Sequence, residues 1–157
     1  PASLTGDVSG TATVTAPLGR ALDRPLGATP GWRPAAGREA TSVFEPLAVA
    51  RGFTWARVGM MTGRQHQIRA HAEHVGFPLV GDKIYGVPPD IFLTFIEDGW
   101  TDRHEELLAH RRQALHAGRV VFDLADERLE FEAPLAHDLV KFCQERMGIA
   151  DPIGLVG

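Results

Sequence analysis

Apolar and polar residues alternate along several short stretches of the chain, as they do in β-strands. Threonine and valine dominate residues 9–20, which predicts a short strand that ends at a proline and a glycine. Residues 40–50 and 53–63 form two longer strand-like stretches, separated only by Arg51 and Gly52. So short a connection predicts that these two strands pair as a β-hairpin.

A second hairpin is predicted over residues 114–124 and 128–135. In the latter stretch Leu129, Phe131 and Ala133 alternate with charged residues. That alternation is typical of an antiparallel strand with one face on a core and the other in water. The second hairpin is therefore expected to be half-solvated.

Apolar residues spaced three or four apart predict helices elsewhere. In residues 65–75, Ile68, Ala72 and Val75 fall on one stripe, the face expected to pack on a sheet. Three further helices are predicted over residues 88–99, 101–111 and 136–148.

Residues 20–38 are rich in proline and glycine, which predicts a loop or flap with no element of its own. Strands dominate both halves of the chain, and helices lie between and after them. The fold class predicted is therefore α+β, with a mixed, mostly antiparallel sheet and flanking helices.

The amino-acid composition limits the class of protein and the cellular compartment that can be expected. With 44% hydrophobic and 23% charged residues, the chain is of the ordinary globular class. The single cysteine, Cys143, excludes an internal disulfide and favours a reducing, cytoplasmic setting. No apolar stretch is long enough for a membrane span. The net charge of −4 argues against nonspecific nucleic-acid coating, although 14 of the 16 cations are arginines, which suit phosphate and carboxylate.

Arginines and histidines are concentrated in residues 61–86. Arg64 and Arg69 lie near the start of the predicted helix, where backbone N–H groups and the helix dipole favour anions. We therefore expect an anion or carboxylate site there. The alternative is a solvated polar face on which the histidines fall by chance.

A metal site is the other alternative for this helix, because His66, His71 and His74 are close in sequence. The spacing of the zinc-protease motif is absent, however, and no third ligand accompanies His71 and His74. We therefore expect no metal here.

Three ordered motifs resemble the RluA family of pseudouridine synthases: "TGRQHQIRAH", "GFPLVGDKIYG" and "RQALHAGRVVFDLADERLEFEAPL". Phe77 stands where the family usually has histidine in the second motif. The shorter runs "APLGR" and "GREAT" also match. The resemblance runs through nearly all 157 residues in order.

The resemblance implies a partial pseudouridine synthase fold and an RNA partner, either rRNA or tRNA. Such enzymes break the N1 glycosidic bond of uridine, rotate the base and rejoin it through C5, without a cofactor. By this resemblance Arg69 is the catalytic-site residue that holds the catalytic aspartate. The residues expected to face RNA are Arg64, His66, Gln67, Lys83 and Tyr85.

The Gly-Asp-Lys-Ile-Tyr-Gly turn supplies two of these residues. Asp82 is expected to tie the turn to the protein while Lys83 faces the RNA. For Tyr85, packing into the core is an equal alternative.

The family's His-Arg-Leu-Asp segment, which carries the catalytic aspartate, is absent from this sequence, and so is the tyrosine that stacks on uracil. Asp23 echoes the aspartate only faintly. Because the chain also begins at Pro1, residues 1–157 are expected to be the C-terminal portion of a catalytic domain, inactive alone, with the missing N-terminal half as its partner. The alternative is a non-catalytic RNA-binding module.

Overall fold

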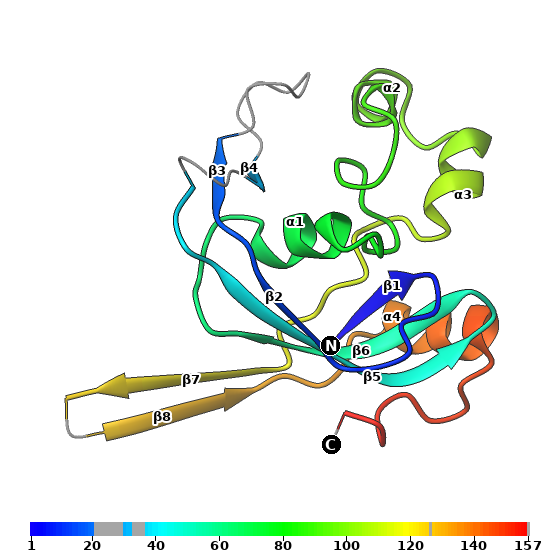
Figure 1. Ribbon diagram of the computed structural model, residues 1–157. Helices are drawn as coiled ribbons and strands as arrows, with labels where there is room; N and C mark the ends of the chain where they lie inside the picture. The colour runs from blue at the N-terminus through cyan, green and yellow to red at the C-terminus, as the bar shows by residue number, and fades with distance from the viewer. Residues whose placement is uncertain (21–29, 33–36, 126, 157) are drawn as a thin grey trace.

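A four-stranded antiparallel sheet forms the centre of the protein in a computed structural model, which describes residues 1–20, 30–32, 37–125 and 127–156 (Figure 1). The strand order is β1 (Ala2–Thr5), β6 (Phe53–Met60), β5 (Thr41–Ala50) and β2 (Ala12–Thr15). Each neighbouring pair is antiparallel. The architecture is α+β, as predicted.

The β5–β6 hairpin is the longest pairing in the sheet. Arg51 (φ 53°) and Gly52 (φ 78°) both take the left-handed conformation in the connecting turn. A two-residue turn with both φ values positive matches the right-handed twist of the strands, so the predicted hairpin is confirmed. The register shifts once, between Pro46 and Ala48, where a bulge bends β5.

All four predicted helices are present, each a little shorter than expected. The last one continues as a wider π-helical turn, η1 (Cys143–Met147), and ends at Gly148 in the left-handed conformation. The four helices are α1 (Gln67–His74), α2 (Asp90–Asp98), α3 (Asp102–Leu108) and α4 (His137–Phe142).

Two hydrophobic clusters lie on opposite faces of the sheet. Successive side chains of a strand point to opposite faces. Ala56 accordingly joins the cluster that contains Ala72 of α1, whereas Trp55 joins the cluster that contains Leu139 of α4. The sheet is thus covered by α1 on one face and by α4 with η1 on the other.

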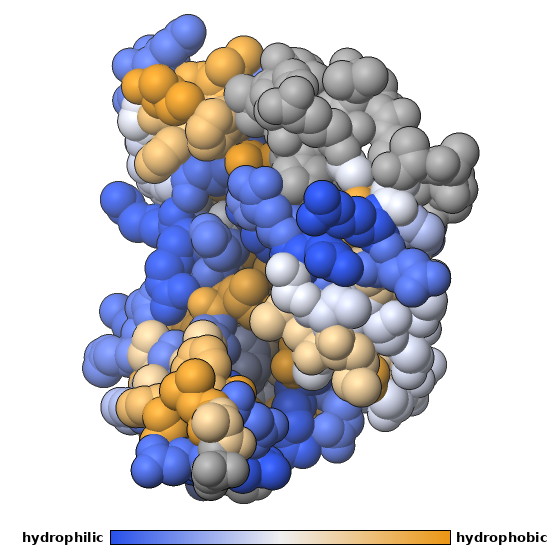
Figure 2. All heavy atoms as spheres, turned by 90° about the vertical axis from the view of Figure 1, so that its left-hand side faces the viewer, coloured by the Kyte–Doolittle hydropathy of each residue, from blue (hydrophilic) through white to orange (hydrophobic). Residues whose placement is uncertain are grey.

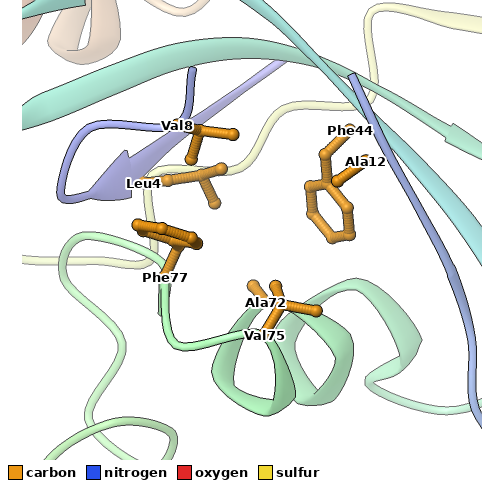
Figure 3. Close-up of a pocket in the computed structure, with 7 residues that line it drawn as sticks. All are labelled: Leu4, Val8, Ala12, Phe44, Ala72, Val75 and Phe77. Carbon is orange, nitrogen blue, oxygen red and sulfur yellow. The ribbon is translucent and has the colours of Figure 1, made fainter. Parts of the chain in front are cut away.

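The cluster under α1 encloses an apolar cavity of about 40 Å³. Side chains from β1, β2, β5 and α1, and from the residues that follow β1 and α1, point into it (Figure 3). The lining residues are Leu4, Val8, Ala12, Phe44, Ala72, Val75 and Phe77.

Two small ribbons complete the fold. β3 (Leu18–Arg20) pairs with β4 (Pro30–Trp32), so the prediction that residues 20–38 contain no element is wrong. β4 forms because its backbone groups bond to β3, and the residues of β4 themselves carry no strand pattern from which this could be predicted. The second ribbon pairs β7 (Arg119–Leu124) with β8 (Glu127–Glu132) and projects from the body of the protein (Figure 1).

The β7–β8 ribbon is more exposed than the half-solvated strand expected there. Phe122 is 51% exposed and Phe131 58% exposed. Figure 2 views the molecule from the side on which the ribbon projects and shows hydrophobic side chains gathered over it.

Among the residues that the structure describes, none of the helices has the length and apolar composition that a membrane span requires.

Candidate functional site

The start of α1 is fixed by the side chain of Gln67. Its Oε1 accepts hydrogen bonds from Thr62 Oγ1 (2.7 Å) and from the backbone N–H of Arg64 (3.0 Å). Its Nε2 donates to the carbonyl of Thr41 (2.9 Å) and to Ser42 Oγ (3.0 Å). These four bonds fill the capacity of the amide. Gln67, 2% exposed, therefore joins α1 to β5 and to the loop that follows β6.

His71 is the second polar side chain that α1 turns toward the sheet. Its Nδ1 lies 3.0 Å from Ser42 Oγ and its Nε2 lies 3.0 Å from the carbonyl oxygen of Ala16. Burial lowers the pKa of His71, the bond to Ala16 opposes that shift, and the charge of His74 adds to it. His71 is fully buried and its lowered pKa favours the neutral ring, so its role is to hold β5, and the residue that follows β2, against α1.

Arg69, on another face of α1, forms a bidentate ion pair with Asp82. Nε donates to Oδ2 and Nη2 to Oδ1, each over 2.7 Å. The Asp82 side chain is fully buried and that of Arg69 is 12% exposed. Burial alone would lower the pKa of Arg69, but the hydrogen bond and charge of Asp82, with a contribution from Tyr85, raise it.

Asp82 also holds its own turn. Its Oδ1 accepts hydrogen bonds from the backbone N–H groups of Ile84 (3.0 Å) and Tyr85 (3.1 Å). Such side-chain-to-backbone bonds stabilise tight turns. The expectation that Asp82 ties the turn to the protein is therefore met by the geometry, and the group that it is tied to is Arg69.

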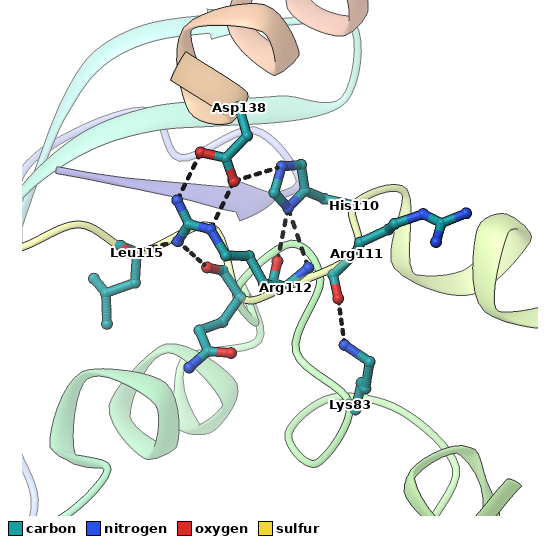
Figure 4. Close-up of polar contacts among 7 residues, drawn as sticks. Lys83, His110, Arg111, Arg112, Leu115 and Asp138 are labelled. Carbon is teal, nitrogen blue, oxygen red and sulfur yellow. Dashed lines mark hydrogen bonds and ion pairs between the residues drawn. The ribbon is translucent and has the colours of Figure 1, made fainter. Parts of the chain in front are cut away.

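Gly81, just before this aspartate, lies against the segment 110–112. Its φ is +75°, and a Cβ placed on it would be 2.0 Å from the carbonyl oxygen of Arg112. Only glycine fits both the conformation and the space. Arg112 is itself anchored to the start of α4 by a bidentate pair with Asp138, 2.6 and 2.8 Å long (Figure 4). Arg112 holds the pKa of Asp138 below its usual range.

Tyr85 and His66 complete the surroundings of Arg69. The guanidinium lies 4.9 Å from the centre of the Tyr85 ring, whose hydroxyl is 3.2 Å from His66 Nδ1. Tyr85 is 1% exposed, which agrees with the alternative that it packs into the core. Burial and the charge of Arg69 lower the pKa of His66, while Asp82 opposes them. His66 is half-buried and adopts the left-handed conformation (φ 54°) at the start of α1.

The remaining predicted residues lie nearer the surface. Lys83 Nζ donates to the carbonyl of Arg111 (2.5 Å) and lies over the rings of Phe95 and Trp100. Arg64 is exposed, and its Nε donates to the carbonyl of Glu39 (3.2 Å).

The structure thus gathers His66, Arg69, Asp82, Lys83 and Tyr85 into one cluster, whereas Gln67 points into the sheet. Within the described parts of the chain, no three His, Cys, Asp or Glu residues are placed to hold a metal ion. Asp23 lies outside the described residues.

Sequence comparison relates the chain to curated pseudouridine synthases, although no family model matches it. It is 35% identical over 142 residues to ribosomal large subunit pseudouridine synthase D of Pseudomonas aeruginosa, covering 86% of this chain and 41% of that protein. It is 36% identical over 107 residues to the same-named protein of Haemophilus influenzae, covering 67% and 32%. An uncharacterised RNA pseudouridine synthase of Bacillus subtilis is 34% identical over 110 residues, covering 69% and 31%.

Solved structures agree on the fold. Human RNA pseudouridylate synthase domain containing 1 superposes with a TM-score of 0.66 at 22% identity, covering 88% of this chain and 55% of that one. Human RNA pseudouridylate synthase domain containing 4 gives 0.65 at 17% identity, covering 91% and 59%. The fold is that of a pseudouridylate synthase domain. The chain belongs to the RluA family and aligns with the C-terminal part of its curated relatives, spanning less than half of their length.

Proposed function

We propose that this chain is the C-terminal part of the catalytic domain of an RNA pseudouridine synthase, an isomerase that converts uridine to pseudouridine. The homology to named pseudouridine synthases supports the reaction. Ribosomal RNA is the favoured substrate, because two of the relatives carry the large ribosomal subunit in their names.

The geometry of Arg69 is the observation that carries the proposal. Asp82 occupies the edge of the guanidinium formed by Nε and Nη2. Within the described residues nothing accepts a hydrogen bond from Nη1, and part of the side chain is exposed. A guanidinium has five N–H donors in a rigid plane, so its outer edge can hold a second carboxylate. Asp82 orients Arg69, and the outer edge is available for the catalytic aspartate.

Asp82 is not itself a substitute for that aspartate. Its side chain is fully buried, and its oxygens accept four hydrogen bonds, two from Arg69 and two from backbone N–H groups. Oδ1 accepts three of these bonds and Oδ2 one, and because the side chain is fully buried the remaining lone pair of Oδ2 is not accessible to a substrate. The catalytic aspartate is therefore assigned to the part of the domain that the relatives have outside the aligned region.

The predicted RNA-binding residues divide into two groups by exposure. The exposed Arg64, with the half-buried His66 and Lys83, is assigned to contact RNA. Gln67 and Tyr85 are buried, so they are positioning residues: Gln67 fixes the start of α1, and Tyr85 supports the guanidinium of Arg69.

The test uses RNA that carries tritium at C5 of uridine, since rejoining the base through C5 releases that hydrogen. The product of the full-length gene is expected to release tritium, and this 157-residue chain alone is not. Arg69→Ala should abolish release, because a pocket carboxylate would lose its charge partner. Arg64→Ala should mainly weaken RNA binding and reduce its salt dependence.

Arg103→Ala is the matched control, because Arg103 is exposed and pairs with Asp90 on the neighbouring helix. Turnover by the isolated chain, or equal losses of turnover in the Arg69 and Arg64 variants with RNA affinity unchanged, would contradict the assignments. RNA binding by the full-length product without any tritium release would instead support the non-catalytic module.

A further inference from the structure

Two cations share one aromatic surface beside the candidate site. Lys83 Nζ lies 4.5 Å from the ring centre of Phe95 and 5.4 Å from that of Trp100. The guanidinium of Arg111 lies 5.3 Å from the same Trp100 ring. We call Lys83, Phe95, Trp100 and Arg111 the Trp100 cluster. Cation–π contacts of this kind hold a charged group in place without using its hydrogen-bond donors.

Arg111 differs from the other arginines of this region. Arg103 pairs with Asp90, and Arg112 pairs with Asp138. The side chain of Arg111 is exposed and, within the described residues, makes neither an ion pair nor a hydrogen bond. Figure 4 shows its guanidinium pointing away from the Arg112–Asp138 pair, while only its backbone carbonyl is engaged, by Lys83.

The carboxylate beside the Trp100 ring, that of Glu105, accepts a hydrogen bond from Trp100 Nε1 (3.1 Å) and, within the described residues, forms no ion pair with Lys83 or Arg111. Two like charges over the same ring repel each other, and a bound anion would relieve that repulsion. The guanidinium of Arg111, held over the Trp100 ring, has all its N–H donors available, and its planar arrangement of donors suits phosphate oxygens. Lys83 gives one N–H to the carbonyl of Arg111 and has two further donors.

We propose that the Trp100 cluster is a binding site for an RNA backbone phosphate, with Arg111 as its principal ligand and Lys83 as the second. This inference rests on the proposed function, because it takes RNA as the partner. Lys83 directly follows Asp82, the partner of Arg69. An RNA strand whose phosphate is bound at the Trp100 cluster would therefore lie close to Arg69. The close contact between Gly81 and the carbonyl of Arg112 fixes the distance between the Trp100 cluster and Arg69.

The test measures binding of this chain to a fluorescein-labelled stem-loop of ribosomal RNA by fluorescence anisotropy, over a range of salt concentrations. Arg111→Gln should weaken binding roughly three- to tenfold and lower the slope of log affinity against log salt by about 1, as the loss of one phosphate contact does. Arg103→Gln removes an exposed charge from α3 and should change neither quantity by a comparable amount. Trp100→Leu keeps both cations but removes their support, and should weaken binding less than Arg111→Gln.

Equal affinities and salt slopes for Arg111→Gln and Arg103→Gln would overturn the phosphate site and leave the proposed reaction standing. Failure of the unmodified chain to bind the RNA at low salt would also overturn it. A selective loss in Arg111→Gln together with no tritium release by the full-length product would have the opposite meaning: the phosphate site would stand and the proposed reaction would fall. Circular dichroism of each variant verifies that the fold is retained.

Discussion

The β5–β6 and β7–β8 hairpins are both antiparallel and both carry alternating apolar residues, but only the first is built into a core. Phe44 and Trp55 of the first are 2% and 0% exposed. Phe122 and Phe131 of the second are 51% and 58% exposed. Similar local patterns thus lead to opposite environments.

The difference lies in the neighbours of each hairpin. β5–β6 has β2 and β1 at its edges and helices on both faces. In β7–β8 the register sets Val120 opposite Phe131 and Phe122 opposite Leu129, which places these apolar side chains on one face. None of the hydrophobic clusters formed by the described residues includes a residue of this ribbon. Alternation determines which side chains share a face, and not whether anything covers that face.

The largest effect expected from this comparison is on Trp55. Trp55→Ala should lower the free energy of unfolding by about 3–5 kcal/mol, because it removes a fully buried indole from the cluster under α4. Phe122→Ala, the matched change in β7, should cost less than about 1 kcal/mol, as surface substitutions do. Urea unfolding followed by circular dichroism measures both. Similar losses would mean that β7–β8 is as well packed as β5–β6.

Ion pairs extend the comparison from apolar to charged groups. Asp82→Asn should cost about 3–5 kcal/mol, because the partly buried guanidinium of Arg69 loses its carboxylate. Glu130→Gln breaks the pair that Glu130 makes with Arg119 on the β7–β8 ribbon, where both groups are in water. The urea midpoint of Glu130→Gln should equal that of the unmodified chain, and a clear drop would contradict this account.

Acid should lower the stability of the protein by disturbing the packing of α1 on β5, where two histidines have lowered pKa values. Burial lowers the pKa of His71 below 6.5, and burial also lowers that of His66. Between the lowered pKa and 6.5 the unfolded chain binds more protons than the folded one, so stability falls as pH falls below about 6.5. Urea midpoints measured from about pH 7 to pH 5 should decline, and His71→Gln should flatten the decline.

Amide exchange locates this acid effect. Protection of the β5 amides should fall along with the urea midpoint, because His71 is bonded to Ser42 of that strand. A midpoint that stays constant down to about pH 5 would contradict the buried, neutral state of His71.

The smallest effect concerns the cavity under α1. Ala12→Val places two methyl groups beside Phe44, and should stabilise the protein by roughly 0.5–1 kcal/mol. Val120→Ile enlarges an apolar side chain on the exposed face of β7, and should leave the urea midpoint unchanged. An equal gain in both variants would show that propensity for strands, and not filling of the cavity, is responsible.

The features that could be predicted from the sequence depend on local signals. The β5–β6 hairpin follows from a two-residue turn whose conformation suits Arg51 and Gly52. The existence of α1 follows from its apolar period, although Val75 is 37% exposed. β4 was missed because its three residues form a strand only by pairing with β3.

The candidate site shows the same division. A cation at Arg69 facing a carboxylate was predictable from the motif, but its partner in this chain, Asp82, lies 13 residues further on and meets it only through the fold. The sequence suggests Gln67 as an RNA-facing residue and His71 as a candidate metal ligand or part of a solvated face, whereas both are buried and hydrogen-bonded to the protein. Hydrophobic periodicity does not identify a polar side chain that is buried because all its hydrogen bonds are made. The role of Arg111 could not be predicted either, since it depends on Trp100 from a different segment.

Gly81 has no side chain, yet it governs how much variation this region tolerates. Any larger residue would have to move away from the carbonyl of Arg112, and Asp82 and Lys83 would move with it. In a library of single-residue variants, selection for turnover or for RNA affinity should therefore deplete every substitution at Gly81. Intolerance at this position would originate in the backbone, at a residue that has no side chain to offer a substrate.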